Sequence, residues 1–135
     1  MTGLSRLASA SLALLLACAA HLPRWDPAAV TVVRLLKPHS REERVVTDGG
    51  TIEELIACLS RAEKVDRASG ADLALVLDIG RRGRDGSVIG DRFLYDAASG
   101  ELARRTYPVR PAFRLREADR ARFAALLAAD AGPTE

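Results

Sequence analysis

The chain has 135 residues, which is enough for one domain and leaves little for a second. Apolar residues make up 48% and charged residues 28%, as in ordinary globular proteins. The formal net charge of only +2 argues against a nucleic-acid-binding protein, because that class carries a stronger basic excess. The chain contains no Asn or Gln, so any polar site must be built from other side chains.

The first twenty residues have the pattern of an export signal. Arg6 is the only charged residue among them, and an uncharged run rich in Leu and Ala follows at residues 7–17. A run of 11 residues suits the apolar region of a signal peptide but is too short to cross about 30 Å of hydrocarbon as a helix. The sequence therefore predicts export, by one of two processing routes.

One route is indicated by the stretch LLAC at residues 15–18, which resembles the lipobox of bacterial lipoproteins. The match consists of Leu at −3, Ala at −1 and the cysteine, whereas Leu16 at −2 is larger than the usual residue. The resemblance covers residues 1–18 and implies that Cys18 carries a lipid that attaches the protein to a membrane. Because Ala19 rather than an aspartate follows, it also implies the periplasmic side of the outer membrane.

The other route is ordinary cleavage before Ala20, after an A-x-A site at residues 17–19. This route would yield a soluble periplasmic or secreted protein. On either route Cys18 is acylated or lost, so Cys58 has no intrachain partner and we expect no disulfide in the mature domain. We interpret Cys58 as a buried thiol on a helix.

Residues 19–27 (AAHLPRWDP) contain two prolines and are predicted to be a tether, followed by a single domain over residues 28–135. About nine extended residues reach roughly 30 Å at most, so the domain would lie close to the membrane. Trp25 is the only tryptophan. We expect it to cover one edge of the core, the alternative being a position at the membrane interface.

The first half of the domain predicts a hairpin and a helix. Residues 29–36 and 44–47 are rich in β-branched side chains and predict two strands. Thr51 and Glu54 have the spacing of a capping box, and Ile52, Leu55, Ile56 and Leu59 repeat with helical period. This helix is predicted to end near residues 63–65.

The second half predicts three strands and a helix. The apolar run at residues 72–79 suits a central strand, and residues 87–95 predict the next strand, with a bulge at Gly90. Between them, GRRGRDG at residues 80–86 is expected to be an exposed loop. DAASG at residues 96–100 is expected to form a hairpin turn with Gly100 in the left-handed position.

The last two elements are a strand at residues 102–109, placed at an edge or ended by Pro108, and a helix at residues 116–129. The expected buried side of that helix is Ala121, Phe123, Ala124, Leu126 and Leu127. The order β-β-α-β-β-β-α predicts an α+β fold: a small antiparallel sheet of about five strands with two helices packed on one face.

Few residues suit catalysis. His21 lies in the tether, and His39 lies in a polar turn beside Ser40, where sequence neighbours rarely take the geometry of a catalytic triad. A hydrolase built on His39 and Ser40 is the only enzyme alternative. Metal-ligand spacings are absent from the sequence, so we predict no enzyme activity, no metal and no cofactor.

The strongest binding signal is basic. Residues 81–122 contain 11 arginines and 6 acidic residues, a local excess of +5. The candidate patch consists of Arg81, Arg82, Arg84, Arg104 and Arg105. Such a face suits an acidic protein, anionic lipid headgroups or lipopolysaccharide phosphates, and the alternative is an ordinary solvated surface. The sequence therefore predicts a lipid-anchored envelope protein with a binding or structural role.

Overall fold

The computed structural model describes residues 22–38, 40–65, 73–104 and 112–129. The elements are β1 (Val32–Leu36), β2 (Glu43–Val46), α2 (Gly49–Ser60), β3 (Glu63–Val65), β4 (Leu75–Arg82), β5 (Val88–Asp96), β6 (Glu101–Arg104), β7 (Ala112–Arg114) and α3 (Glu117–Ala129). The strands form one sheet in the order β2-β1-β4-β5-β6-β7-β3, and every neighbouring pair is antiparallel. The predicted α+β class is confirmed.

The described sheet has seven strands, so the expectation of about five was too low. The two missed strands, β3 and β7, have three residues each and pair with one another. Strands this short leave no periodic pattern in the sequence. Their pairing depends on contacts between distant parts of the chain rather than on local composition.

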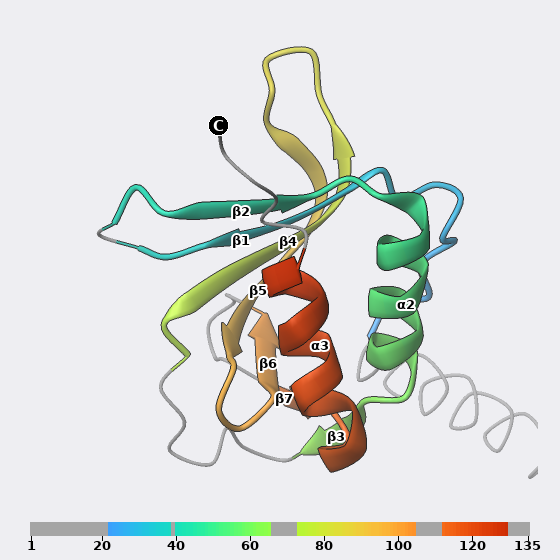
Figure 1. Cartoon of the computed structure of the whole chain (residues 1–135), viewed down its shortest axis with the longest axis vertical. Coiled ribbons are helices and arrows are strands. Elements are labelled where there is room, and N and C mark those ends of the chain that lie inside the picture. Colours follow the sequence, from blue (N-terminus) through green and yellow to red (C-terminus); the bar gives the residue numbers. More distant parts are fainter. Residues whose placement is uncertain (1–21, 39, 66–72, 105–111, 130–135) are drawn as a thin grey trace, which may run out of the picture.

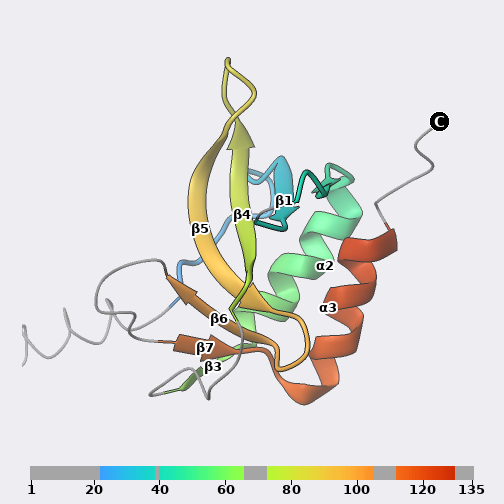
Figure 2. The same cartoon turned by 90° about the vertical axis from the view of Figure 1, so that its left-hand side faces the viewer.

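Both described helices pack on one face of the sheet, as predicted (Figures 1 and 2). The core lies between the two layers, and the predicted apolar stripe of α2 is buried in it. Phe123 and Leu127 contribute from α3, whereas Ala121, which was expected on the buried side, is exposed. Trp25 packs against the edge of the core, in agreement with the expectation for that residue.

The ends of α2 differ from the prediction. The N-cap is Asp48, whose carboxylate accepts hydrogen bonds from the Thr51 amide (2.9 Å) and hydroxyl (2.8 Å). Thr51 is therefore a residue of the first turn, and the predicted capping box is wrong. The helix ends at Ser60, and the residues expected at its C-terminal end form β3 instead. Pairing with β7 outweighs the helical propensity of this segment.

The predicted turn at residues 96–100 is confirmed. The Asp96 carbonyl accepts from the Gly100 amide at 2.9 Å, and Gly100 has φ +73°, a conformation that glycine adopts without strain. Within the described part of the chain, the strand predicted at residues 102–109 is present as β6, which ends at Arg104. The proposed signal peptide (residues 1–18) and the first residues of the tether lie outside the described residues.

Candidate functional site

The β4–β5 hairpin is the most prominent feature of the sheet. Its two strands pair from Leu75 opposite Tyr95 to Arg82 opposite Val88. Figures 1 and 2 show its tip projecting beyond the rest of the sheet and beyond both helices. β4 continues to Arg82, so the first three residues of the expected loop, 80–82, belong to a strand. The true turn is confined to residues 83–87.

The turn is closed by its own hydrogen bonds. The Gly83 amide donates to the Ser87 carbonyl at 2.7 Å, and Gly86 has φ +84°, which favours glycine. The Asp85 carboxylate accepts from the Ser87 hydroxyl (2.6 Å) and amide (3.1 Å), which lowers the pKa of Asp85 below its usual value. The tip therefore has a defined shape, and its one carboxylate is engaged within the turn.

Two glycines allow the strands to approach closely below the tip. Gly80 lies directly opposite Gly90. A Cβ atom on Gly80 would lie 2.1 Å from the Ile89 carbonyl oxygen, and one on Gly90 would lie 2.2 Å from the Ile79 carbonyl oxygen. The pairing is regular here, so the predicted bulge at Gly90 is wrong and the glycines serve close backbone approach.

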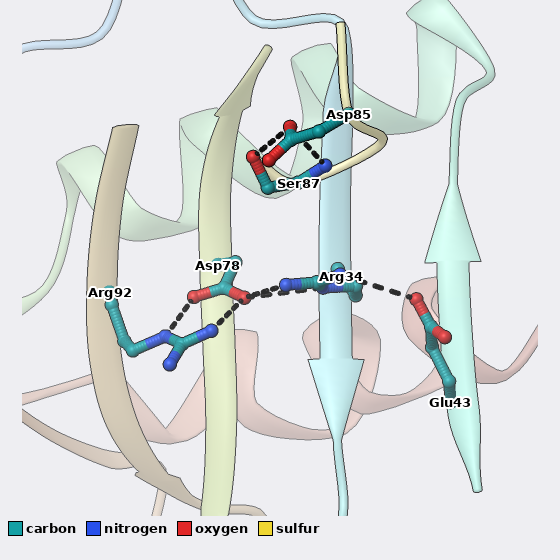
Figure 3. Close-up of polar contacts among 6 residues, drawn as sticks. All are labelled: Arg34, Glu43, Asp78, Asp85, Ser87 and Arg92. Atoms are coloured by element: carbon teal, nitrogen blue, oxygen red, sulfur yellow. Dashed lines mark hydrogen bonds and ion pairs between the residues drawn. The ribbon is translucent and has the colours of Figure 1, made fainter. Parts of the chain in front are cut away.

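The base of the hairpin is held by a buried carboxylate, Asp78, which is only 3% exposed (Figure 3). It accepts from Arg92 on β5 (Nε 2.7 Å, Nη2 3.0 Å) and from Arg34 on β1 (Nη2 2.9 Å, Nε 3.2 Å). Glu43 on β2 lies 3.7 Å from Nη1 of Arg34. The network joins four adjacent strands. Arg92 binds both carboxylate oxygens of Asp78, the strong bidentate geometry for this pair, whereas both Arg34 nitrogens donate to Oδ2.

The charge state of Asp78 follows from this geometry. Burial raises its pKa, but the hydrogen bonds from Arg92 and Arg34 outweigh burial and leave the pKa below the ordinary value of 3.8. The neighbours of Asp78 along the strand, Leu77 and Ile79, belong to the core, so strand alternation places Asp78 on the sheet face without helices. The carboxylate is therefore ionised and fixed at neutral pH.

The helix-bearing face of the hairpin base carries a second cluster. The Trp25 Nε1 atom donates to an Asp91 carboxylate oxygen at 2.9 Å, and the Trp25 ring meets Phe93 edge-on at 5.9 Å. The Arg104 guanidinium lies over the Phe93 ring at 5.3 Å and 3.5 Å from the Asp91 carboxylate. Side chains therefore secure the base of the hairpin on both faces.

The tip differs from the base in its arginines. Arg81, Arg82 and Arg84 are all exposed, and within the described residues none of them forms an ion pair or a side-chain hydrogen bond. Next to them, Ile89 is 52% exposed, the only exposed large apolar side chain among the described residues. Because Ile89 lies directly opposite Arg81, these two side chains share one face of the hairpin.

The structure divides the arginine patch predicted from the sequence. Arg81, Arg82 and Arg84 come together at the tip, but Arg104 pairs with Phe93, five residues along β5 from Val88. At about 3.3 Å per residue this is roughly 17 Å from the tip. Arg104 therefore belongs to the cluster at the base, which corrects its assignment to the patch. Arg105 lies outside the described residues.

The other residues singled out from the sequence lie outside the described part of the chain, in a turn or in the core. Cys18, His21 and His39 lie outside the described residues, and the Ser40 hydroxyl accepts from the Glu42 amide at 2.9 Å within a turn. Cys58 is buried, and burial, followed by the nearby Asp119 charge, raises the pKa of its thiol. Among the described residues, no three acidic, histidine or cysteine side chains lie close enough together to hold a metal ion.

The same described stretches contain no helix long and apolar enough to span a membrane.

Sequence reasoning missed Ile89 as a surface feature. Alternation places it on the same sheet face as Phe93, which is buried, so the pattern alone makes Ile89 a core residue. It is exposed because the hairpin extends past the helices that cover Phe93, and the sequence carries no signal for where that cover ends.

Comparison with known proteins gave no match: no family description, no curated protein and no solved structure resembles this chain at a significant level.

Proposed function

We propose that this protein is a non-enzymatic binding protein of the cell envelope, which docks on an acidic surface of a protein partner through the tip of the β4–β5 hairpin. One observation supports the proposal above all others. Three exposed arginines, which have no acidic partner among the described residues, and one exposed isoleucine lie at the end of a projecting hairpin whose turn is closed by its own hydrogen bonds. We call Arg81, Arg82, Arg84 and Ile89 the tip patch.

The chemistry of the tip patch suits recognition of carboxylates. A guanidinium without an internal partner keeps all five of its N–H donors for a bidentate contact with a carboxylate. Ile89 adds apolar area that becomes buried when a partner covers it. A single hairpin offers a small contact surface, so we expect a transient complex that weakens as salt rises.

The location is part of the proposal and rests on the resemblance of residues 15–18 to a lipobox. Cys18 would carry the lipid and hold the domain on the periplasmic side of the envelope, at the outer membrane. Leu22 lies four positions after Cys18, a span of about 14 Å at most. The folded domain would therefore sit close to the membrane that anchors it.

The direction of the hairpin favours a protein partner over lipid headgroups or lipopolysaccharide. Leu22 lines a groove together with Ser60 and Ala62 at the C-terminal end of α2. Figure 1 shows the hairpin tip at the opposite end of the domain. An anchor entering beside the end of α2 leaves the tip facing away from the anchoring membrane, where acidic protein surfaces are accessible.

The anchor and the tip are tested separately. Labelling with radioactive palmitate and fractionation of cells, with Cys18→Ser as the control, decide between the lipid-anchored protein and a soluble periplasmic or secreted binding or inhibitor protein. Absence of label on the wild type, with no effect of Cys18→Ser on fractionation, would contradict the anchor. That outcome would leave the tip patch proposal standing as a property of a soluble protein.

The tip is tested by placing a photoreactive amino acid at position 85 and crosslinking in intact cells. We expect a discrete adduct that is lost in the triple variant Arg81→Ser, Arg82→Ser, Arg84→Ser. The matched control is Lys37→Ser, Arg41→Ser, Arg44→Ser, which removes three exposed charges from the β1–β2 hairpin. Equal loss of the adduct in both triple variants, or no adduct in the wild type, would contradict docking at the tip.

A further inference from the structure

An open groove lies on the helix-bearing face of the sheet, at the C-terminal end of α2. It has a volume of about 1150 Å³, more than the roughly 1,000 Å³ that ordinary small-molecule pockets reach. Its described walls come from α2, from strands β3, β6 and β7 and from the segment before β1. Phe113 in its wall lies opposite the core residue Leu102, which places the groove on the face that carries the helices. The groove can therefore hold a long occupant.

Apolar side chains make up much of the lining of this groove. They are Leu22, Trp25, Ile56, Leu59, Ala62 and Phe113. Three of them, Leu22, Trp25 and Ala62, are only half-buried and pack against the core. An apolar occupant would remove the rest of their surface from water, which is favourable. The lining therefore suits a hydrocarbon chain.

The charged side chains that line the groove are basic. Arg24, Lys64 and Arg104 line it, and none of the described lining residues is acidic. Arg24 and Lys64 are exposed and form no ion pair or side-chain hydrogen bond within the described residues. Arg104 and Trp25 share the Asp91 carboxylate, at 3.5 Å and 2.9 Å. Three cations beside one carboxylate favour an occupant with an anionic group.

We infer that this groove binds an anionic phospholipid of the anchoring membrane. One acyl chain lies along the apolar side chains, and the phosphate lies against Arg24, Lys64 and Arg104. An acidic peptide would also satisfy the charges, but it would cover the apolar lining with backbone N–H and C=O groups that need partners of their own. An acyl chain has no such groups, so the lining favours the lipid.

The membrane as the source of the lipid rests on the anchor proposed for Cys18. Leu22 lines the groove and lies four positions after Cys18, so the groove has a wall within about 14 Å of the residue that would carry the lipid. The tip patch lies at the opposite end of the domain and takes no part (Figure 1). Lipid binding in the groove and partner docking at the tip are therefore independent.

Trp25 makes the test direct, because it lines the groove and is the only tryptophan in the chain. The protein purified from cells is mixed with vesicles that contain equal amounts of phosphatidylglycerol and phosphatidylcholine. Bromine, which quenches tryptophan fluorescence only at close approach, is placed on the acyl chains of one lipid or of the other. The surface charge is then the same in both vesicles. We expect brominated phosphatidylglycerol to quench Trp25 about fivefold more strongly, the effect of one basic contact that choline would oppose.

Two variants and a matched control make the test specific. The double variant Arg24→Ser, Lys64→Ser should bring the two quenching values close to equality. The control Arg81→Ser, Arg82→Ser removes the same charge from the tip and should leave the fivefold ratio unchanged. Ser60→Glu places a carboxylate in the lining and should also lower the ratio. All of these positions are exposed, and circular dichroism confirms that each variant is folded.

The inference is overturned by equal quenching from the two vesicles, by no quenching from either, or by a preference for phosphatidylglycerol that survives Arg24→Ser, Lys64→Ser. A shift of Trp25 emission with a glutamate-rich peptide, without quenching by either vesicle, would replace the lipid by a peptide. Absence of palmitate label on Cys18 would contradict the anchor alone, because vesicles present the lipid to anchored and unanchored protein alike. Failure of the anchor and failure of the groove are therefore distinguishable.

Discussion

The base and the tip of the β4–β5 hairpin use the same residue type in opposite ways. At the base, Arg34 and Arg92 converge on the buried carboxylate of Asp78. At the tip, the three arginines have no such partner in the described residues. The guanidinium groups are chemically identical, so the difference lies in what the fold places within their reach. Arginine thus stabilises the sheet at one end of the hairpin and remains available at the other.

Sheet register decides which role an arginine takes. Arg92 lies opposite Asp78, whereas Arg81 lies opposite Ile89 and Arg82 lies opposite Val88. A shift of one position in the pairing would separate the carboxylate from its cross-strand partner. The close approach of Gly80 and Gly90 lies between the two regions and helps to fix that register.

The largest effect is expected from removing the carboxylate at the base. Asp78→Ala leaves Arg34 without its buried partner and should lower the free energy of unfolding by about 3 kcal/mol, since the half-exposed Arg92 can regain water. Urea unfolding of Asp78→Ala and of the control Asp85→Ala measures it. Asp85 lies in the exposed turn, so its loss should cost about 1 kcal/mol or less. Equal costs at both positions would remove the distinction between base and tip.

The next largest effect is expected at the junction of base and tip. Gly80→Ala forces a Cβ atom toward the Ile89 carbonyl oxygen and should lower the free energy of unfolding by about 2 kcal/mol. The matched control is Gly49→Ala, because a Cβ atom at Gly49 meets nothing within 4 Å and lies in a helix. The control should be neutral or stabilising by up to about 1 kcal/mol. Thermal unfolding compares the two, and an unaffected Gly80→Ala would mean that close approach is not needed there.

A smaller effect is expected from pH. The folded-state pKa of Asp78 lies below its ordinary value of 3.8, so the carboxylate contributes stability above about pH 4 and that contribution is lost as the pH falls through the folded-state pKa. The difference in unfolding free energy between the wild type and Asp78→Asn should therefore shrink below pH 4. Urea titrations at pH 7, 5, 3 and 2 measure this difference. A constant difference down to pH 2 would mean that the Asp78 ion pairs contribute nothing specific to the charged form.

The smallest effect on stability is expected at the tip. The triple variant Arg81→Ser, Arg82→Ser, Arg84→Ser should change the free energy of unfolding by no more than about 0.5 kcal/mol, because these exposed side chains form no ion pair or side-chain hydrogen bond within the described residues. Thermal unfolding at low salt is the measurement. A clear loss of stability would show that the tip arginines support the fold, and would remove the reason for assigning them to a partner.

Local sequence patterns predicted the two strands of this hairpin and the exposed loop between them, but not the different roles of its base and its tip. The apolar run of β4 and the turn residues after it locate the two strands, and three of the five predicted patch arginines do lie together. Arg104 does not, because its partners Asp91 and Phe93 come from the neighbouring strand and are set by register. Asp78 appeared only as one polar residue within an apolar strand. Its two arginine partners lie on different strands, so spacing along the chain gives no sign of them.

The same limit explains the missed strands. Residues 63–65 continue a helical pattern locally and become β3 only because β7 lies beside them. Composition and periodicity indicate the secondary structure that a segment prefers in isolation. Which segments pair as strands depends on contacts between distant parts of the chain.

The pairing of β3 with β7 also has a consequence for the order of assembly. Glu63 lies opposite Arg114, which comes about fifty residues later in the chain. Arg34 binds Asp78, which comes 44 residues later. A chain that emerges from its N-terminus can close the β1–β2 hairpin at once, but it cannot complete the β3 end of the sheet until residue 114 is available. Long loops must close before these contacts form, which slows folding. Until then the growing sheet presents unpaired strand edges. At this stage the chain is most prone to pair with other chains and aggregate.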